Sequence, residues 1–168
     1  MSGARRTWGW YRLADEWAAR VVADAGIRPG ELVFDIGAGE GALTTHLLCA
    51  GACVIAVEPH PGRAAVLRAR FPGTTVLELD AGSLRLPGRP FRVVANPPYS
   101  ITASLLRQLL ASPSGLTSAC LVLQRAAVRK HAASRRRGFR LSEGLSLPRS
   151  AFTPQPRVDS AVLVVKRR

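Results

Sequence analysis

Short apolar runs alternate along the chain with stretches in which apolar positions recur at helical spacing. The apolar runs predict strands that are buried on both faces, as in a parallel sheet. They are residues 31–36, 52–57, 74–79, 91–95 and 117–123. Helical periodicity predicts helices over residues 13–25, 42–48, 59–70, 101–110 and 126–134. Strands that alternate with helices predict a doubly wound, mostly parallel α/β sheet.

Two further strands are predicted near the C-terminus, over residues 145–152 and 160–165. The turn Pro154-Gln155-Pro156 lies between them. Because a short connection joins antiparallel neighbours, we expect an antiparallel pair at the edge of a seven-stranded sheet. The length of 168 residues predicts one domain covering residues 1–168.

A glycine loop, Gly37-Ala38-Gly39-Glu40-Gly41, follows the first of these strands and opens a helix. Two cofactors compete for such a loop. A dinucleotide needs G-x-G-x-x-G/A, which the loop satisfies in its loose form. S-adenosylmethionine (SAM) is typically bound by an acid followed by alternating glycines, and Asp35 precedes the glycines here. Because SAM carries an ammonium group and no phosphate, Asp35 favours SAM.

Polar residues also end the next three strands of the predicted sheet. Glu58 could accept hydrogen bonds from ribose hydroxyls, and Asp80 could accept one from an adenine amino group. Asn96-Pro97-Pro98-Tyr99 follows the fourth strand. Its prolines remove backbone donors and stiffen the turn, so the Asn96 amide and the neighbouring carbonyls can hold an exocyclic amino group. Tyr99 offers a flat face on which a base can stack.

The net charge of +13 predicts a polyanionic partner. No Asp or Glu occurs in residues 81–142, which contain eleven Arg or Lys. Because acids would balance a merely solvated face, this asymmetry favours RNA. The candidate RNA-binding residues are Arg125, Arg129, Lys130, Arg135, Arg136, Arg137 and Arg140. The first three recur at helical spacing, and the arginine triplet lies in the predicted loop after that helix.

Other classes are disfavoured by the composition. Charged residues interrupt every apolar run, so we expect no membrane segment, and no apolar core follows the arginines of the N-terminus. Three cysteines without a second ligand pair predict no metal site and a reduced, cytoplasmic protein. We expect a monomer.

The motifs resemble those of the rRNA adenine-N6 methyltransferases, most of all the Erm group that acts on 23S rRNA. The resemblance rests on the glycine loop with Asp35, on Val57-Glu58, on Asp80, on Asn96 to Ile101 and on Leu121 to Arg125. Phe152-Thr153-Pro154-Gln155-Pro156-Arg157-Val158-Asp159-Ser160 is its most discriminating segment, since Phe-x-Pro-x-Pro-x-Val-x-Ser is characteristic of the rRNA dimethylase superfamily.

The resemblance implies roles for individual residues. Asn96 and Pro97 would hold the target amine, and Tyr99 and Phe152 would stack on the flipped base. The expected cofactor contacts are Trp10, Arg12, Asp35, Gly37, Gly39, Glu58, Asp80 and Asn96. The family's Gln-Asn-Phe-Leu motif is replaced by residues 8–13 here, and the chain ends where members continue into a helical C-terminal domain. The chain therefore resembles short Erm variants that consist of the catalytic domain alone.

Methylation of the peptidyl-transferase region by such an enzyme would block macrolide, lincosamide and streptogramin B binding. The alternatives are a KsgA-type small-subunit rRNA dimethylase, a DNA adenine-N6 methyltransferase and a non-catalytic RNA-binding factor of ribosome assembly. An NAD(P) oxidoreductase is disfavoured by Asp35 and by the Asn-Pro-Pro-Tyr turn.

Overall fold

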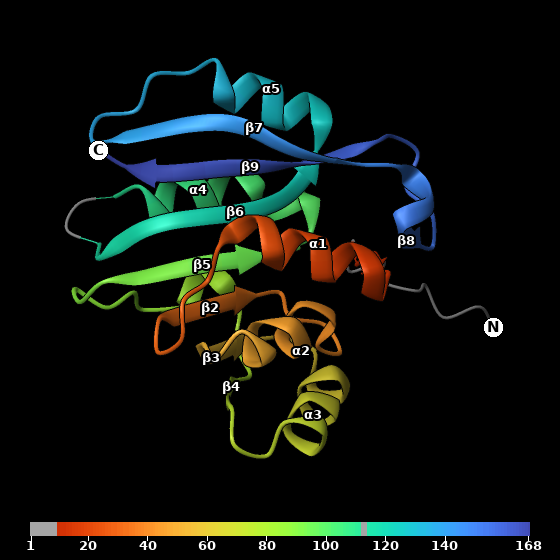
Figure 1. Ribbon diagram of the computed structural model, residues 1–168. Helices are drawn as coiled ribbons and strands as arrows, with labels where there is room; N and C mark the ends of the chain where they lie inside the picture. The colour runs from red at the N-terminus through yellow and green to blue at the C-terminus, as the bar shows by residue number, and fades with distance from the viewer. Residues whose placement is uncertain (1–9, 112–113) are drawn as a thin grey trace.

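One twisted sheet forms the middle layer of the computed structural model, which describes residues 10–111 and 114–168 (Figure 1). In spatial order its strands are β4 (Thr75–Leu77), β3 (Cys53–Val57), β2 (Leu32–Ile36), β5 (Phe91–Ala95), β6 (Leu116–Gln124), β9 (Ser160–Arg167) and β7 (Phe139–Leu147). The first five strands are parallel, and β9 runs antiparallel to both β6 and β7. The predicted seven-stranded sheet with an antiparallel pair at its edge is confirmed.

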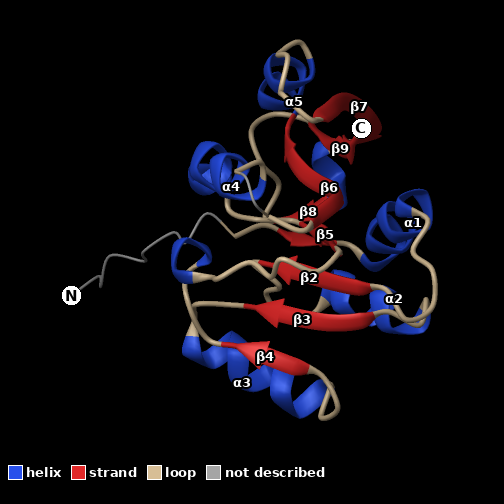
Figure 2. Cartoon of the chain, turned by 90° about the vertical axis from the view of Figure 1, so that its left-hand side faces the viewer, coloured by secondary structure: helices blue, strands red, loops and turns tan. Residues whose placement is uncertain are grey.

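Helices cover both faces of the sheet (Figure 2). The helices α1 (Asp15–Ala25) and α2 (Ala42–Cys49) pack on one face, where Val33 and Val122 lie in their core cluster. The helix α3 (Pro61–Arg70) packs Leu67 against Ala56. On the opposite face, α4 (Thr102–Leu109) and α5 (Arg125–Ala132) join a core cluster that includes Phe91. The positions of all five helices agree with the periodicity of the sequence.

The strand predicted over residues 145–152 is the main error in the expected fold. The strand β7 begins at Phe139 and ends at Leu147, before Pro148. Pro148 cannot donate to a strand ladder, so pairing ends there. The connection to β9 contains the 3-10 turn η3 (Arg149–Ala151) and the short strand β8 (Phe152–Thr153). The strand β8 leaves the sheet and pairs with β1 (Arg12–Leu13).

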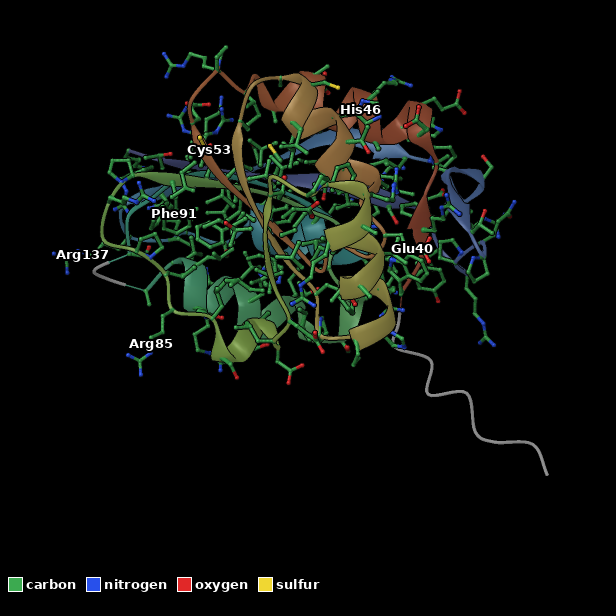
Figure 3. The ribbon with its side chains drawn as sticks, turned by 90° about the horizontal axis from the view of Figure 1, so that it is seen from below. Glu40, His46, Cys53, Arg85, Phe91 and Arg137 are labelled. Carbon is green, nitrogen blue, oxygen red and sulfur yellow. The ribbon has the colours of Figure 1, made fainter. Side chains whose placement is uncertain are left out.

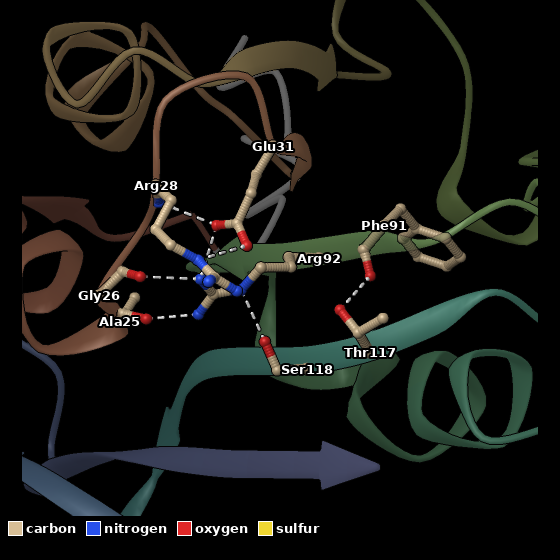
Figure 4. A network of polar contacts seen from close by, with 8 residues as sticks. All are labelled: Ala25, Gly26, Arg28, Glu31, Phe91, Arg92, Thr117 and Ser118. Carbon is tan, nitrogen blue, oxygen red and sulfur yellow. Dashed lines mark hydrogen bonds and ion pairs between the residues drawn. The ribbon is translucent and has the colours of Figure 1, made fainter.

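Arg92 anchors the end of the sheet at which the parallel strands begin (Figure 4). Its Nη1 donates to the Glu31 carboxylate over 2.9 Å and to the Gly26 carbonyl over 3.0 Å, and its Nε donates to Ser118 Oγ over 2.7 Å. Nη2 donates to the Ala25 carbonyl. Arg92 thus ties the end of α1 to β5 and β6, and its charge is neutralised by Glu31.

No helix within the described ranges, 10–111 and 114–168, is long and apolar enough to cross a bilayer.

Candidate cofactor and adenine site

The predicted functional residues converge at the edge of the sheet where the parallel strands end. Ile36 pairs with Val57, and the pairing of Phe34 with Val93 brings the end of β5 to the same level. Gly37, Glu58 and Asn96 directly follow the last residues of β2, β3 and β5. This edge is the expected location of a ligand site in a doubly wound sheet.

Two neighbouring cavities open along this edge. The first has a volume of about 320 Å³, and Asp35, Arg12 and Asn96 line it. The second has a volume of about 420 Å³, and Glu58 and Asp80 line it together with residues of the Pro98–Gln108 segment. Trp10 and Gly37 line both cavities, so they lie at the boundary between them.

The glycine loop lies directly against the Asn-Pro-Pro-Tyr turn. A Cβ atom built on Gly37 would lie 3.2 Å from Pro97 Cα and 3.2 Å from Pro98 Cδ, and the φ of Gly37 is +74°. A side chain at position 37 is therefore disfavoured both by its neighbours and by the backbone conformation. This contact brings two motifs that are 60 residues apart in the sequence to one side of the cleft.

Trp10 covers the second glycine of the loop. A Cβ on Gly39 would lie 2.5 Å from the indole Nε1 of Trp10, and the φ of Gly39 is +59°. The guanidinium of Arg63 lies 4.6 Å from the centre of the indole ring, which is cation–π distance. The indole ring is therefore held between the glycine loop and α3.

Glu58 is 2 % exposed, and both of its oxygens are bonded. Oε2 accepts from the Gly39 N–H over 2.9 Å, while Oε1 accepts from Arg63 Nε over 2.9 Å and from the His60 N–H over 3.2 Å. The carboxylate thus links the glycine loop after β2 to the start of α3. A ribose that binds here must use its remaining acceptor sites or displace one of these donors.

Asp35 is the unusual titratable group of the site. Its side chain is 1 % exposed, and Thr44 Oγ1 donates to Oδ2 over 2.7 Å. The other oxygen, Oδ1, is buried and has no hydrogen-bond partner among the described residues. Burial raises the pKa of Asp35 to about 7, and the nearby Glu58 charge adds to this increase while the Thr44 hydrogen bond opposes it.

The Asn96 side chain is oriented by the backbone of the preceding N-terminal segment. Asn96 Nδ2 donates to the Tyr11 carbonyl over 2.9 Å, and Asn96 lines the first cavity. Asn96 Oδ1 has no hydrogen bond to any residue in 10–111 or 114–168 and stays available as an acceptor. The ring of Tyr11 stacks on Tyr99 with centroids 5.4 Å apart. The Tyr99 hydroxyl is within 2.8 Å of Ser160 Oγ, and burial raises the pKa of Tyr99.

Phe152, which the resemblance assigns to stacking on the flipped base, lies in the core. Its side chain is 2 % exposed and packs in the core cluster beneath α1 and α2. The pairing of β8 with β1 sets Phe152 opposite the buried Leu13. In this conformation the ring has no free face on which a base could stack.

The predicted RNA-binding arginines do not form one patch beside the cleft. Arg125 Nε lies 3.3 Å and Arg129 Nε 3.7 Å from the Glu143 carboxylate, so that acid partly neutralises the start of α5. Arg135, Arg136 and Arg137 follow α5 at the end of the sheet opposite the cofactor edge, and Arg140 lies on β7. Figure 3 shows this separation, with Glu40 of the first cavity at one end of the molecule and Arg137 at the other.

Sequence reasoning missed Arg63, Tyr11 and Ser160. Arg63 follows Glu58 by five residues across the start of α3, so no strand or helix spacing pairs the two. The contacts of Tyr11 and Ser160 depend on long-range packing of the N-terminal segment and of β9. No group of three potential metal ligands occurs among the residues described.

The strand order, the glycine loop and the acid after β3 define the class of fold, that of the SAM-dependent methyltransferases. The crystal structure of the 23S rRNA methyltransferase ErmE superposes with a TM-score of 0.82 at 30% identity, covering 91% of this chain and 68% of that one. A dimethyladenosine transferase from Plasmodium falciparum superposes with a TM-score of 0.78 at 26% identity, covering 93% of this chain and 63% of that one.

The family model for ribosomal RNA adenine dimethylases matches residues 10–168, and the chain belongs to this family. It is 34% identical to an rRNA adenine N-6-methyltransferase of Corynebacterium diphtheriae, over 80% of this chain and 57% of the relative. It is 33% identical to a ribosomal RNA small subunit methyltransferase A of Thermosynechococcus vestitus, over 99% of this chain and 71% of the relative. The chain thus spans little more than half of the Corynebacterium protein. At the level of the family, the predictions of an enzyme and of SAM as its cofactor are confirmed.

Proposed function

We propose that this chain methylates the exocyclic N6 of an adenine in 23S rRNA, in the peptidyl-transferase region. Resistance to macrolides, lincosamides and streptogramin B would follow. The contact between Gly37 and the Pro97–Pro98 turn is the observation that carries the proposal, because it sets an amine-binding turn against a cofactor loop. The similarity to ErmE supports 23S rRNA as the substrate.

The residues of the cleft fit SAM. Asp35 Oδ1 is a buried acceptor that no described residue contacts by a hydrogen bond, as an ammonium group requires. Gly37 and Gly39 leave no room for side chains, as a loop that a ligand approaches closely requires. Glu58 would accept from the ribose and Asp80 from the adenine of the cofactor, and both line the larger cavity. When bound there, SAM supplies an electrophilic methyl group.

The residues of this chain then act on the target amine. Its lone pair is delocalised into the purine ring, so the amine is a weak nucleophile. Asn96 Oδ1 and the Pro97 carbonyl would accept its two hydrogens, which favours a tetrahedral nitrogen whose lone pair points at the methyl group. Positioning is the main contribution to the rate, and the proton can leave after transfer.

The flipped base needs a stacking partner. Tyr99 is the candidate, with its hydroxyl held by Ser160 and one side of its ring next to Tyr11. Stacking of a base on an aromatic ring contributes about 1–3 kcal/mol. Phe152 would contribute indirectly, through the packing that holds the β8 segment.

Labelled SAM and total rRNA test this proposal. We expect label in 23S rRNA, and primer extension should stop at an adenine of the peptidyl-transferase region. Label in 16S rRNA would instead favour small-subunit methylation, which the Thermosynechococcus relative supports. Absence of label from both RNAs, with SAM still bound, would contradict the proposal. Asn96→Ala should abolish transfer and leave SAM binding within a few-fold of the unmodified chain.

A further inference from the structure

A strongly basic surface lies at the end of the sheet opposite the cleft. Two loops and the C-terminus contribute exposed arginines to this distal basic surface. Its members are Arg85, Arg89, Arg135, Arg136, Arg137 and Arg168. Figure 3 shows Arg85 and Arg137 together at this end, far from Glu40.

Backbone and side-chain hydrogen bonds hold these segments next to one another. The Gly115 N–H donates to the Pro87 carbonyl over 3.1 Å, and the Arg168 N–H donates to the Gly138 carbonyl over 2.9 Å. Arg167 donates to the carbonyls of Leu116 and Ser114 over 2.7 and 2.8 Å. These hydrogen bonds therefore fix the positions of the segments that carry the surface. A hollow of about 690 Å³ lies between Arg137, Arg167 and Ser114.

The charge of this surface is not balanced. None of its six guanidinium groups has a hydrogen bond or an ion pair with any residue in 10–111 or 114–168. Arg92, in contrast, lies at the same end of the sheet and is neutralised by Glu31. All eleven acidic residues of the chain lie outside residues 81–142, which contribute five of the six arginines.

We propose that the distal basic surface binds the phosphate backbone of a second part of the substrate RNA. This inference rests on the proposed function for the nature of the substrate. The nine residues of β6 separate the surface from the cofactor edge by roughly 26 Å, at about 3.3 Å per residue. Arg129 and Lys130 on α5 lie between the two ends and mark the path of the RNA.

RNA fits this surface better than a membrane does. Arginine presents a planar fork that matches phosphate oxygens, and arginines make up this surface, with Lys166 near them on β9. Amphipathic elements that bind membranes also present apolar side chains that enter the lipid. Val158 is the exposed large hydrophobic residue within the described ranges, and it lies next to β9 at the cofactor edge.

Two RNA hairpins with the same target loop test the inference. One has a stem shorter than the span between the two ends, and the other has a longer stem. The variant R135Q/R136Q/R137Q removes three distal charges, and R20Q/R68Q/R149Q is a control that removes three exposed arginines away from this end of the sheet. Fluorescence anisotropy without SAM measures binding, so the readout does not require methyl transfer. Circular dichroism and SAM binding verify that both variants fold.

The distal variant should bind the long hairpin about tenfold or more weakly and lose about two to three from the slope of log K against log salt. Its binding to the short hairpin and its kcat at saturating long hairpin should match the unmodified chain. Equal binding of the long hairpin, or an equal loss in the control, would overturn the inference. A variant that loses only binding to anionic phosphatidylserine vesicles would overturn it in favour of a membrane. Methyl transfer to the short hairpin tests the proposed function separately.

Discussion

The side-chain amide of Asn96 donates a hydrogen bond to the Tyr11 carbonyl over 2.9 Å. Because the nitrogen of the amide faces the Tyr11 carbonyl, the orientation of the amide plane is fixed. Its oxygen, Oδ1, lies on the other side as the acceptor that the target amine requires. A backbone carbonyl of the N-terminal segment thereby determines the orientation of a side chain that follows β5.

Asn96→Asp is expected to lower kcat at least tenfold. Aspartate keeps an oxygen at the acceptor position but loses the donor, and its carboxylate then faces the Tyr11 carbonyl, which costs about 1–3 kcal/mol. Single-turnover methyl transfer checks this, and the Kd for SAM should stay within about threefold. Full activity would mean that the Tyr11 carbonyl does not orient the side chain.

Arg63→Met should lower the free energy of unfolding by about 1–3 kcal/mol, because Glu58 would remain buried without its counter-charge. Urea denaturation at neutral pH measures the change. A double-mutant cycle with Glu58→Gln provides the control. If the ion pair is responsible, the double variant loses less than the sum of the single losses, whereas strictly additive losses would contradict the assignment.

The buried Asp35 should make stability depend on pH. Its pKa rises from 3.8 to about 7 on folding, so the folded chain holds the proton more tightly than the unfolded chain. The stabilising contribution is complete below about pH 4 and is lost as the pH rises to about 7, in total about 4 kcal/mol. Asp35→Asn should remove this dependence in denaturation curves measured between these two values.

The same group should control cofactor affinity. An ammonium group favours the ionised carboxylate, so the Kd for SAM should rise about tenfold for each pH unit below about 7. Isothermal titration calorimetry in buffers of different ionisation enthalpy should also detect a released proton. A Kd that does not change between pH 5 and pH 8 would show that Asp35 does not contact the cofactor ammonium.

Phe152→Leu should leave methyl transfer within a few-fold of the unmodified chain, because a buried side chain of similar volume replaces the ring at a cost below about 1.5 kcal/mol. Phe152→Ala should cost about 3–5 kcal/mol of stability. Tyr99→Leu is the matched comparison and should lose about tenfold or more in kcat/KM for RNA. If a stable Phe152→Leu protein lost methyl transfer, the conclusion would be that Phe152 contacts the target base.

The strands and loops around the cleft could be predicted because local patterns determine them. Apolar runs that end in Gly37, Glu58 and Asn96 suffice to place those residues at one edge of a parallel sheet. The strand β7 was misplaced because charged residues and Gly144 interrupt its alternation, although Phe139 and Leu141 are buried and Arg140 is exposed. The bounds of β7 are set by its pairing with β9, and no local pattern of residues contains that information.

The contacts inside the site were harder to predict than its location. Glu58 with Arg63, and Tyr99 with Tyr11, meet only because separate segments pack together. The helix predicted over residues 126–134 and the loop predicted at Arg135, Arg136 and Arg137 are confirmed, whereas Arg140 lies on β7. The two ends of the stretch 125–140 lie at opposite ends of the sheet because α5 begins at the cofactor edge and runs back along β6, and the loop after α5 continues to the start of β7. A charge count cannot reveal that direction.

The position of Trp10 makes the cleft observable without any label. Its indole ring lines both cavities and lies against Gly39 and Arg63, so a molecule that enters either cavity changes the polarity around the ring. Intrinsic tryptophan emission should therefore follow occupancy of the cleft in real time. In a chain with three tryptophans, Trp10→Phe identifies the share of the signal that comes from this ring.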